Sequence, residues 1–109
     1  MTALCDLTAV EVRRLIGNKE ISPVELLESC MERIEAVNGI VNAIVTIDFE
    51  NAKAQAKLAE KAVIEGEELG LLHGLPIGIK DLELTAGMRT TMGSLLFENH
   101  IPKASHWIL

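Results

Sequence analysis

The sequence predicts an α/β fold in which N-terminal helices pack on the first strands of a mixed sheet. Three observations lead to this expectation: two capped amphipathic stretches near the N-terminus, a longer helical pattern after them, and a short apolar run that is typical of a buried strand. The 109 residues are enough for one small domain, and the hydrophobic fraction of 49% is that of a globular protein.

The first two helices are predicted from their start signals. Thr8 is followed by Glu11, and Ser22 by Glu25, which is the spacing of a capping box, in which each side chain caps a backbone N–H of the other residue. Apolar residues recur on one face of both stretches, and the second pattern ends near Asn38–Gly39. We therefore expect two helices packed as an antiparallel pair, with a purely structural role.

A third helix is expected from Phe49 to Glu65, because alanines and a valine share one face there while charged residues occupy the other. The next pattern is the run Leu75–Ile79, which is too short for a typical helix, contains two β-branched residues and follows Gly74. These features favour a buried strand. On this basis residues 1–69 form a mainly helical scaffold, and residues 70–109 form a strand and loops.

Lys80 is the candidate functional residue, because it follows this strand directly. Open α/β sheets bind their ligands at the carboxyl ends of strands, and partial burial there would favour a neutral amine that can act as a base. The alternative is a lysine that keeps its head group in water. Asp81 would favour the charged form, unless the two side chains point to opposite faces, as consecutive residues of a strand do.

Other patterns predict no cofactor and no metal. Gly87 and Gly93 have neither the spacing of a P-loop nor that of a dinucleotide-binding fingerprint. His100 and His106 fit no standard zinc spacing. The two cysteines do not form a disulfide framework, and Cys30 lies on an apolar helical stripe, where we expect a buried free thiol.

The charge balance argues against nucleic acid as a partner, because the net charge is −6 and the isoelectric point is near 5.0. The sequence shows no apolar run long enough to cross a bilayer and no signal-peptide pattern at its start. We therefore expect a cytoplasmic protein without a membrane partner.

Two adjacent blocks, Gly74–Asp81 (GLPIGIKD) and Thr85–Ser94 (TAGMRTTMGS), resemble the amidase signature family. These Ser-Ser-Lys amide hydrolases include the A subunit of glutamine-dependent tRNA amidotransferases. Weaker similarity extends upstream through Ser22–Leu26 and Val41–Ala43. The resemblance implies a partial amidase signature fold. It also implies that Lys80, when neutral, takes a proton from a bridging serine, which in turn deprotonates a nucleophilic serine.

The serines of that triad have no counterpart in this sequence. Ser94 is the only serine expected near Lys80, and it does not match the family's nucleophile. The sequence also stops within an apolar pattern at Trp107–Leu109. We therefore interpret the chain as the N-terminal part of an amidase that acts on a small-molecule amide, is inactive alone, and is completed by a missing C-terminal portion or self-associates. No substrate-binding residue is predicted.

Two alternatives remain open at this point. One is a fragment of a tRNA amidotransferase A subunit. The other is a non-catalytic protein that keeps the scaffold and uses an exposed sheet edge to form oligomers.

Overall fold

The computed structural model describes residues 2–107 and divides the chain into two compact units. The first unit comprises Met1–Asn42 and Phe49–Pro76, and the second comprises Ala43–Asp48 and Ile77–Leu109. The boundary therefore falls inside the apolar run that precedes Lys80. Ile108 and Leu109, which belong to the apolar end noted in the sequence, lie outside the described residues.

The first unit contains a short 3₁₀ helix, η1 (Leu4–Asp6), and three α-helices, which are α1 (Ala9–Gly17), α2 (Pro23–Val41) and α3 (Phe49–Ile64). Both predicted capping boxes are confirmed. The Thr8 hydroxyl accepts a hydrogen bond from the Glu11 N–H at 3.1 Å, and the Glu11 carboxylate accepts one from the Thr8 N–H at 3.3 Å. Ser22 and Glu25 repeat this arrangement at the start of α2.

Helix α2 continues past its expected end near Asn38–Gly39 and stops at Val41. Asn42 caps it in the left-handed conformation, with φ of 49°. Asparagine tolerates this conformation better than most residues, and one glycine inside a helix costs only about 1 kcal/mol. The asparagine rather than the glycine therefore ends the helix.

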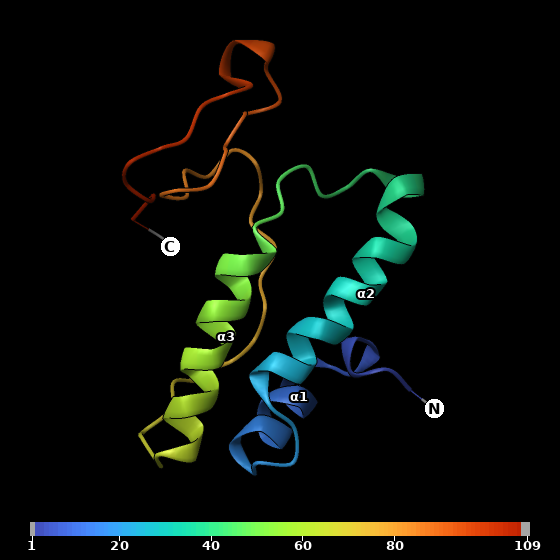
Figure 1. Cartoon of the computed structure of the whole chain (residues 1–109), viewed down its shortest axis with the longest axis vertical. Coiled ribbons are helices and arrows are strands. Elements are labelled where there is room, and N and C mark those ends of the chain that lie inside the picture. Colours follow the sequence, from blue (N-terminus) through green and yellow to red (C-terminus); the bar gives the residue numbers. More distant parts are fainter. Residues whose placement is uncertain (1, 108–109) are drawn as a thin grey trace. The chain divides into compact units, whose positions relative to one another are not determined.

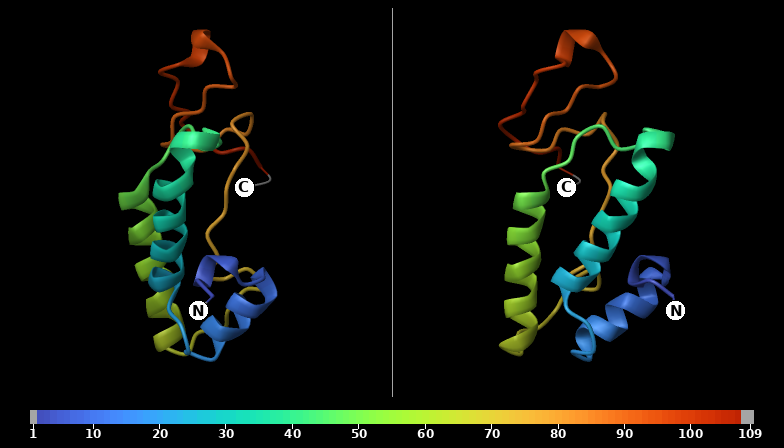
Figure 2. Two further views of the ribbon diagram at one scale, coloured as in Figure 1. Left: turned by 90° about the vertical axis from the view of Figure 1, so that its right-hand side faces the viewer. Right: turned by 45° about the vertical axis from the view of Figure 1, so that its right-hand side comes forward.

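The antiparallel pair consists of α2 and α3, and not of the first two helices as expected (Figure 1). The two helices run in opposite directions side by side, and Lys53 of α3 approaches Glu28 of α2 at 3.7 Å. Helix α1 lies beside the N-terminal end of α2 (Figure 2). This arrangement brings one apolar face of each helix to a common core.

The core of the first unit is formed by Val12, Ile16, Leu26 and Val63, and Ile16 is completely buried. The segment that follows α3 packs back onto this core through Leu69 and Leu75. Two polar contacts attach the same segment: Arg13 Nε donates to the Gly70 carbonyl at 3.0 Å, and His73 Nε2 lies 2.9 Å from the Ala59 carbonyl oxygen.

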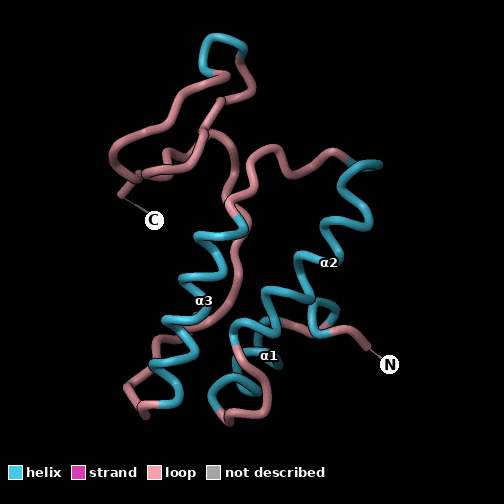
Figure 3. Tube along the Cα trace, in the orientation of Figure 1, coloured by secondary structure: helices cyan, strands magenta, loops and turns pink. Residues whose placement is uncertain are grey.

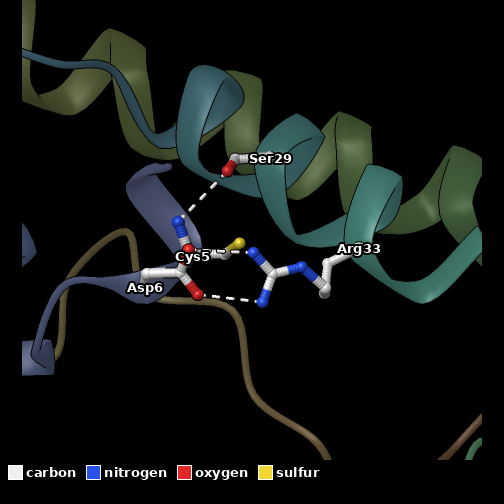
Figure 4. A network of polar contacts seen from close by, with 4 residues as sticks. All are labelled: Cys5, Asp6, Ser29 and Arg33. Carbon is white, nitrogen blue, oxygen red and sulfur yellow. Dashed lines mark hydrogen bonds and ion pairs between the residues drawn. The ribbon is translucent and has the colours of Figure 1, made fainter. Parts of the chain in front are cut away.

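Helix η1 is attached to α2 by a small polar network (Figure 4). Arg33 donates two hydrogen bonds of 2.8 Å to the Asp6 carboxylate, and the Cys5 N–H donates to the Ser29 hydroxyl at 3.1 Å. The expected free thiol at Cys30 is present and half-buried against the core. Burial raises the pKa of this thiol.

The prediction of a mixed sheet is wrong for the described residues, because residues 2–107 contain no strand (Figure 3). Within this range, Ile77, Gly78 and Ile79 share no backbone hydrogen bond with another segment, and Ile77 is 77% exposed. A strand is stable only when a neighbouring strand satisfies its N–H and C=O groups. The run has the composition of a strand, but no described segment pairs with it, and the expected sheet edge is absent as well.

The second unit has no apolar core among its described residues, where only Thr90 and Pro102 are buried. Leu95, Leu96 and Trp107 are 85–90% exposed, and η2 (Leu95–Phe97) is the helical turn found among its described residues. Hydrogen bonds between loops hold this unit together. None of the helices described here has the length and apolar character that a membrane crossing requires.

Substitution of Gly74 tests how tightly the segment after α3 packs on the helices of the first unit. Its φ is +82°, and a Cβ atom there would lie 2.9 Å from Pro23 Cγ and 3.2 Å from Ile16 Cδ1. Gly66 has a similar φ of +72° but open space around it, which makes it a matched control. We expect Gly74→Ala to lower the free energy of unfolding by about 2–4 kcal/mol, and Gly66→Ala by about 1 kcal/mol. Urea denaturation followed by circular dichroism measures both, and equal losses would contradict the close packing at Gly74.

Candidate active site

Lys80 lies in the second unit, in an exposed loop rather than at the end of a buried strand. Its carbonyl oxygen accepts a hydrogen bond of 2.9 Å from the Glu83 N–H, which closes a tight turn directly after it. Leu82 is 54% exposed in this turn. Among the described residues, no ion pair joins Lys80 to Asp81 or to any other carboxylate.

Asp81 points to Thr91 in the second sequence block. One carboxylate oxygen accepts a 2.8 Å hydrogen bond from the Thr91 N–H, and the other accepts a short hydrogen bond from the Thr91 hydroxyl. The Met92 N–H donates to the Asp81 carbonyl oxygen at 2.9 Å. The hydrogen bond from the Thr91 hydroxyl, followed by that from the Thr91 N–H, lowers the pKa of the Asp81 carboxyl. Asp81 therefore links the two sequence blocks by hydrogen bonds.

The turn that binds Asp81 has an unusual backbone. Met92 has φ of 54° and Gly93 has φ of 67°, so two consecutive residues lie in the left-handed region. Such a conformation is unfavourable for methionine, and it persists where surrounding interactions determine it. The N–H groups of this turn have different acceptors: that of Thr91 donates to the Asp81 carboxylate, that of Met92 to the Asp81 carbonyl oxygen, and that of Gly93 to the Thr91 hydroxyl at 3.3 Å. Ser94 ends the turn, and its hydroxyl accepts the Leu96 N–H at the start of η2.

Arg89 joins a third segment to these blocks. Its guanidinium donates to the Glu98 carbonyl at 2.8 Å and to the Val45 carbonyl at 3.1 Å, and the Thr46 hydroxyl donates to the Arg89 carbonyl at 2.9 Å. The positive charge of Arg89 also contributes to the lowered pKa of Asp81. Arg89 thus crosslinks three loops with one side chain.

Both histidines of the second unit have structural contacts. His100 Nδ1 lies 3.1 Å from the Thr90 carbonyl oxygen, and the Thr90 N–H donates to the His100 carbonyl at 2.9 Å. His106 Nδ1 lies 3.1 Å from a carboxylate oxygen of Glu83. Within residues 2–107, no group of His, Cys, Asp and Glu side chains is arranged to hold a metal ion.

The site residues that sequence reasoning missed are Thr91 and Arg89. Both stand in the second block, but their types alone do not show that one binds Asp81 and the other binds backbone carbonyls. A polar residue after a glycine-rich stretch is common in loops, and only the folded backbone brings Thr91 to Asp81. The structure brings Lys80 and the second block into one set of loops, while Ser22 and Ser29 belong to α2 in the first unit.

The amidase family model matches residues 25–107. The chain belongs to the amidase signature family. The resemblance seen in the two blocks is therefore confirmed, and it extends over α2, α3 and the loops that carry Lys80.

Curated relatives of the chain are A subunits of glutamyl-tRNA(Gln) amidotransferases. The subunit from Geobacter sp. strain M21 is 42% identical over 97 residues, covering 89% of this chain and 20% of the relative. The subunit from Bacillus licheniformis is 44% identical over 100 residues, covering 92% and 21%. The chain thus spans about a fifth of the length of these relatives.

Two solved structures share the fold of this chain. A bacterial aryl acylamidase of the amidase signature family has a TM-score of 0.86 at 30% identity, covering 93% of this chain and 21% of that protein. A vestigial protein complex linked to the origins of an s-triazine catabolic enzyme also has a TM-score of 0.86, at 28% identity, covering 91% and 22%.

The lowered pKa of Asp81 gives a direct test of its contact with Thr91. We expect the carboxyl carbon of Asp81 to titrate in nuclear magnetic resonance spectra below the ordinary value of 3.8. Thr91→Val removes the strongest hydrogen bond and should raise the midpoint towards that value. Asp6, whose pKa is lowered by its hydrogen bonds from Arg33, is an internal control that Thr91→Val should not change.

The lowered pKa of Asp81 also determines how the stability of the second unit changes with pH. Because the pKa is lower in the folded chain than in the unfolded chain, where it is about 3.9, ionised Asp81 stabilises the second unit fully above about pH 4. This contribution is lost as the pH falls through the folded pKa. An Asp81 midpoint at or above the ordinary value would contradict the contact.

Proposed function

We propose that this chain provides the general base, Lys80, of an amide hydrolase whose two serines lie on further polypeptide. The observation that supports the proposal is the position of Lys80 within the GLPIGIKD block, which directly contacts the TAGMRTTMGS block through Asp81. Family membership supports a reaction at a carbon–nitrogen bond. No cofactor is needed for this chemistry, because a neutral amine and two hydroxyls can relay the proton.

The proposed step is a proton relay. The neutral amine of Lys80 accepts a proton from the bridging serine, which accepts one from the nucleophilic serine as that oxygen attacks the amide carbon. Lys80 is exposed in the described structure. Covering of this loop by the further polypeptide would favour the neutral amine, because burial disfavours charge. The chain alone is accordingly proposed to be inactive.

A second candidate function is that of a glutamyl-tRNA(Gln) amidotransferase A subunit. It is supported by identities of 39–44% to proteins with that name, compared with 28–30% to the amidases of known structure. The same lysine would then act within a larger assembly, and the completing polypeptide would include the rest of the subunit. The two functions differ in the amide that is cleaved, and both assign the same role to Lys80.

The test joins this chain genetically to the remaining four-fifths of the Bacillus licheniformis relative and measures the hydrolysis of glutamine and of an aryl acylamide. We expect Lys80→Met to lower kcat on the better substrate by roughly 10²–10⁴-fold, the usual contribution of a general base. Lys103→Met removes another exposed lysine of the same unit and should leave kcat unchanged.

Two results would count against the proposal. One is unchanged kcat in the Lys80→Met protein. The other is a folded but inactive joined protein under conditions where the intact relative is active. A preference for glutamine would favour the amidotransferase subunit, and a preference for the aryl acylamide would favour a simple amidase.

A further inference from the structure

We propose that Asp81 is a positioning residue for Lys80, because its carboxylate is held by the Thr91–Gly93 turn, fixes the loop that carries the lysine, and is kept away from the amine. This inference rests on the proposed role of Lys80 as a base. It assigns no contact with substrate to Asp81.

The first step of the argument concerns charge. Lys80 and Asp81 are adjacent, and a free carboxylate beside a lysine favours the ammonium form, which cannot accept a proton. In this structure the carboxylate is engaged elsewhere, by the N–H and hydroxyl of Thr91. Arg89 is the charged group that acts on Asp81 from the second block. The acidic neighbour therefore stays ionised but is bound by donors other than the lysine.

The second step concerns geometry. Asp81 is bound through its carboxylate and through its own carbonyl oxygen, which accepts the Met92 N–H. Lys80 precedes it by one peptide bond, and the Lys80 carbonyl oxygen is fixed by the Glu83 N–H. The lysine backbone is thus held on its C-terminal side by the contacts of its own carbonyl oxygen and of Asp81.

The third step concerns the turn itself. Met92 and Gly93 both adopt positive φ, which costs free energy at the methionine. Thr91 donates to the Asp81 carboxylate at 2.8 Å through its N–H, the Met92 N–H donates to the Asp81 carbonyl oxygen at 2.9 Å, and the Gly93 N–H donates to the Thr91 hydroxyl at 3.3 Å. The carboxylate stabilises this turn through Thr91, since an uncharged side chain would bind the Thr91 donors more weakly.

The structural part of the proposal is tested in this chain by amide hydrogen exchange measured with nuclear magnetic resonance near pH 6. Asp81→Asn should speed exchange at Thr91 and Met92 by tenfold or more. Asp6→Asn is the matched control, because it removes another hydrogen-bonded aspartate in the first unit. Unchanged exchange at Thr91 and Met92 in the Asp81→Asn chain, or fast exchange there in the unsubstituted chain, would overturn the proposal.

The functional part is tested in the joined protein by comparing Thr91→Ser, which keeps the hydroxyl, with Thr91→Val, which removes it. We expect Thr91→Ser to keep kcat within twofold and Thr91→Val to lower kcat about tenfold, with KM unchanged in both. Thr91→Val also removes one of the two Thr91 hydrogen bonds to the carboxylate beside Lys80, so the pH at which kcat rises should move upward.

The Asp81→Asn variant distinguishes a positioning role of Asp81 from a general loss of structure. It should lower kcat without the upward movement of the pH profile, because it removes the negative charge. Loss of kcat in all variants with an unmoved profile would mean a merely structural role and overturn the proposal. If Lys80→Met retains activity while the exchange results are as expected, the proposed function fails and the contact between Asp81 and the turn stands.

Discussion

The structure depends on one constraint, which is that the hydrophobic core of the described residues lies where α1, α2 and α3 meet around Ile16. Burial of apolar area is the main favourable term in folding, so this contact provides the stable part of the chain. The segment after α3 is attached to it by Leu69 and Leu75 and by hydrogen bonds to backbone carbonyls. The helical unit therefore serves as the support from which the loops with Lys80 continue.

The second unit is held by a different kind of interaction. Its loops are crosslinked by polar side chains that bind backbone groups, chiefly Arg89, Thr90 and Asp81. Each hydrogen bond contributes only about 1 kcal/mol, because the same groups bind water in the unfolded chain. These bonds therefore fix the conformation of the loops more than they stabilise the unit. It exposes several leucines and isoleucines, and the chain spans only about a fifth of the length of its curated relatives.

The two sequence blocks have different roles within this arrangement. The first block carries Lys80, and the second carries the turn that binds Asp81. The base role proposed for Lys80 requires fixed backbone neighbours, since displacement of about 1 Å is enough to slow a reaction greatly. The adjacency of a lysine and an aspartate is compatible with base catalysis because the aspartate has donors of its own.

The sequence alone determined the three helices, both capping boxes, the free thiol at Cys30 and the family, because these depend on local periodicity, on residues three positions apart and on contiguous motifs. It did not determine the partner of α2, the contacts of Asp81 and Arg89, or the fate of Leu75–Ile79. Each of these depends on which distant segment supplies a neighbour. A run with strand composition forms a strand only when another segment pairs with it, and the described residues provide none, so only the tertiary structure could decide that Lys80 lies on a loop.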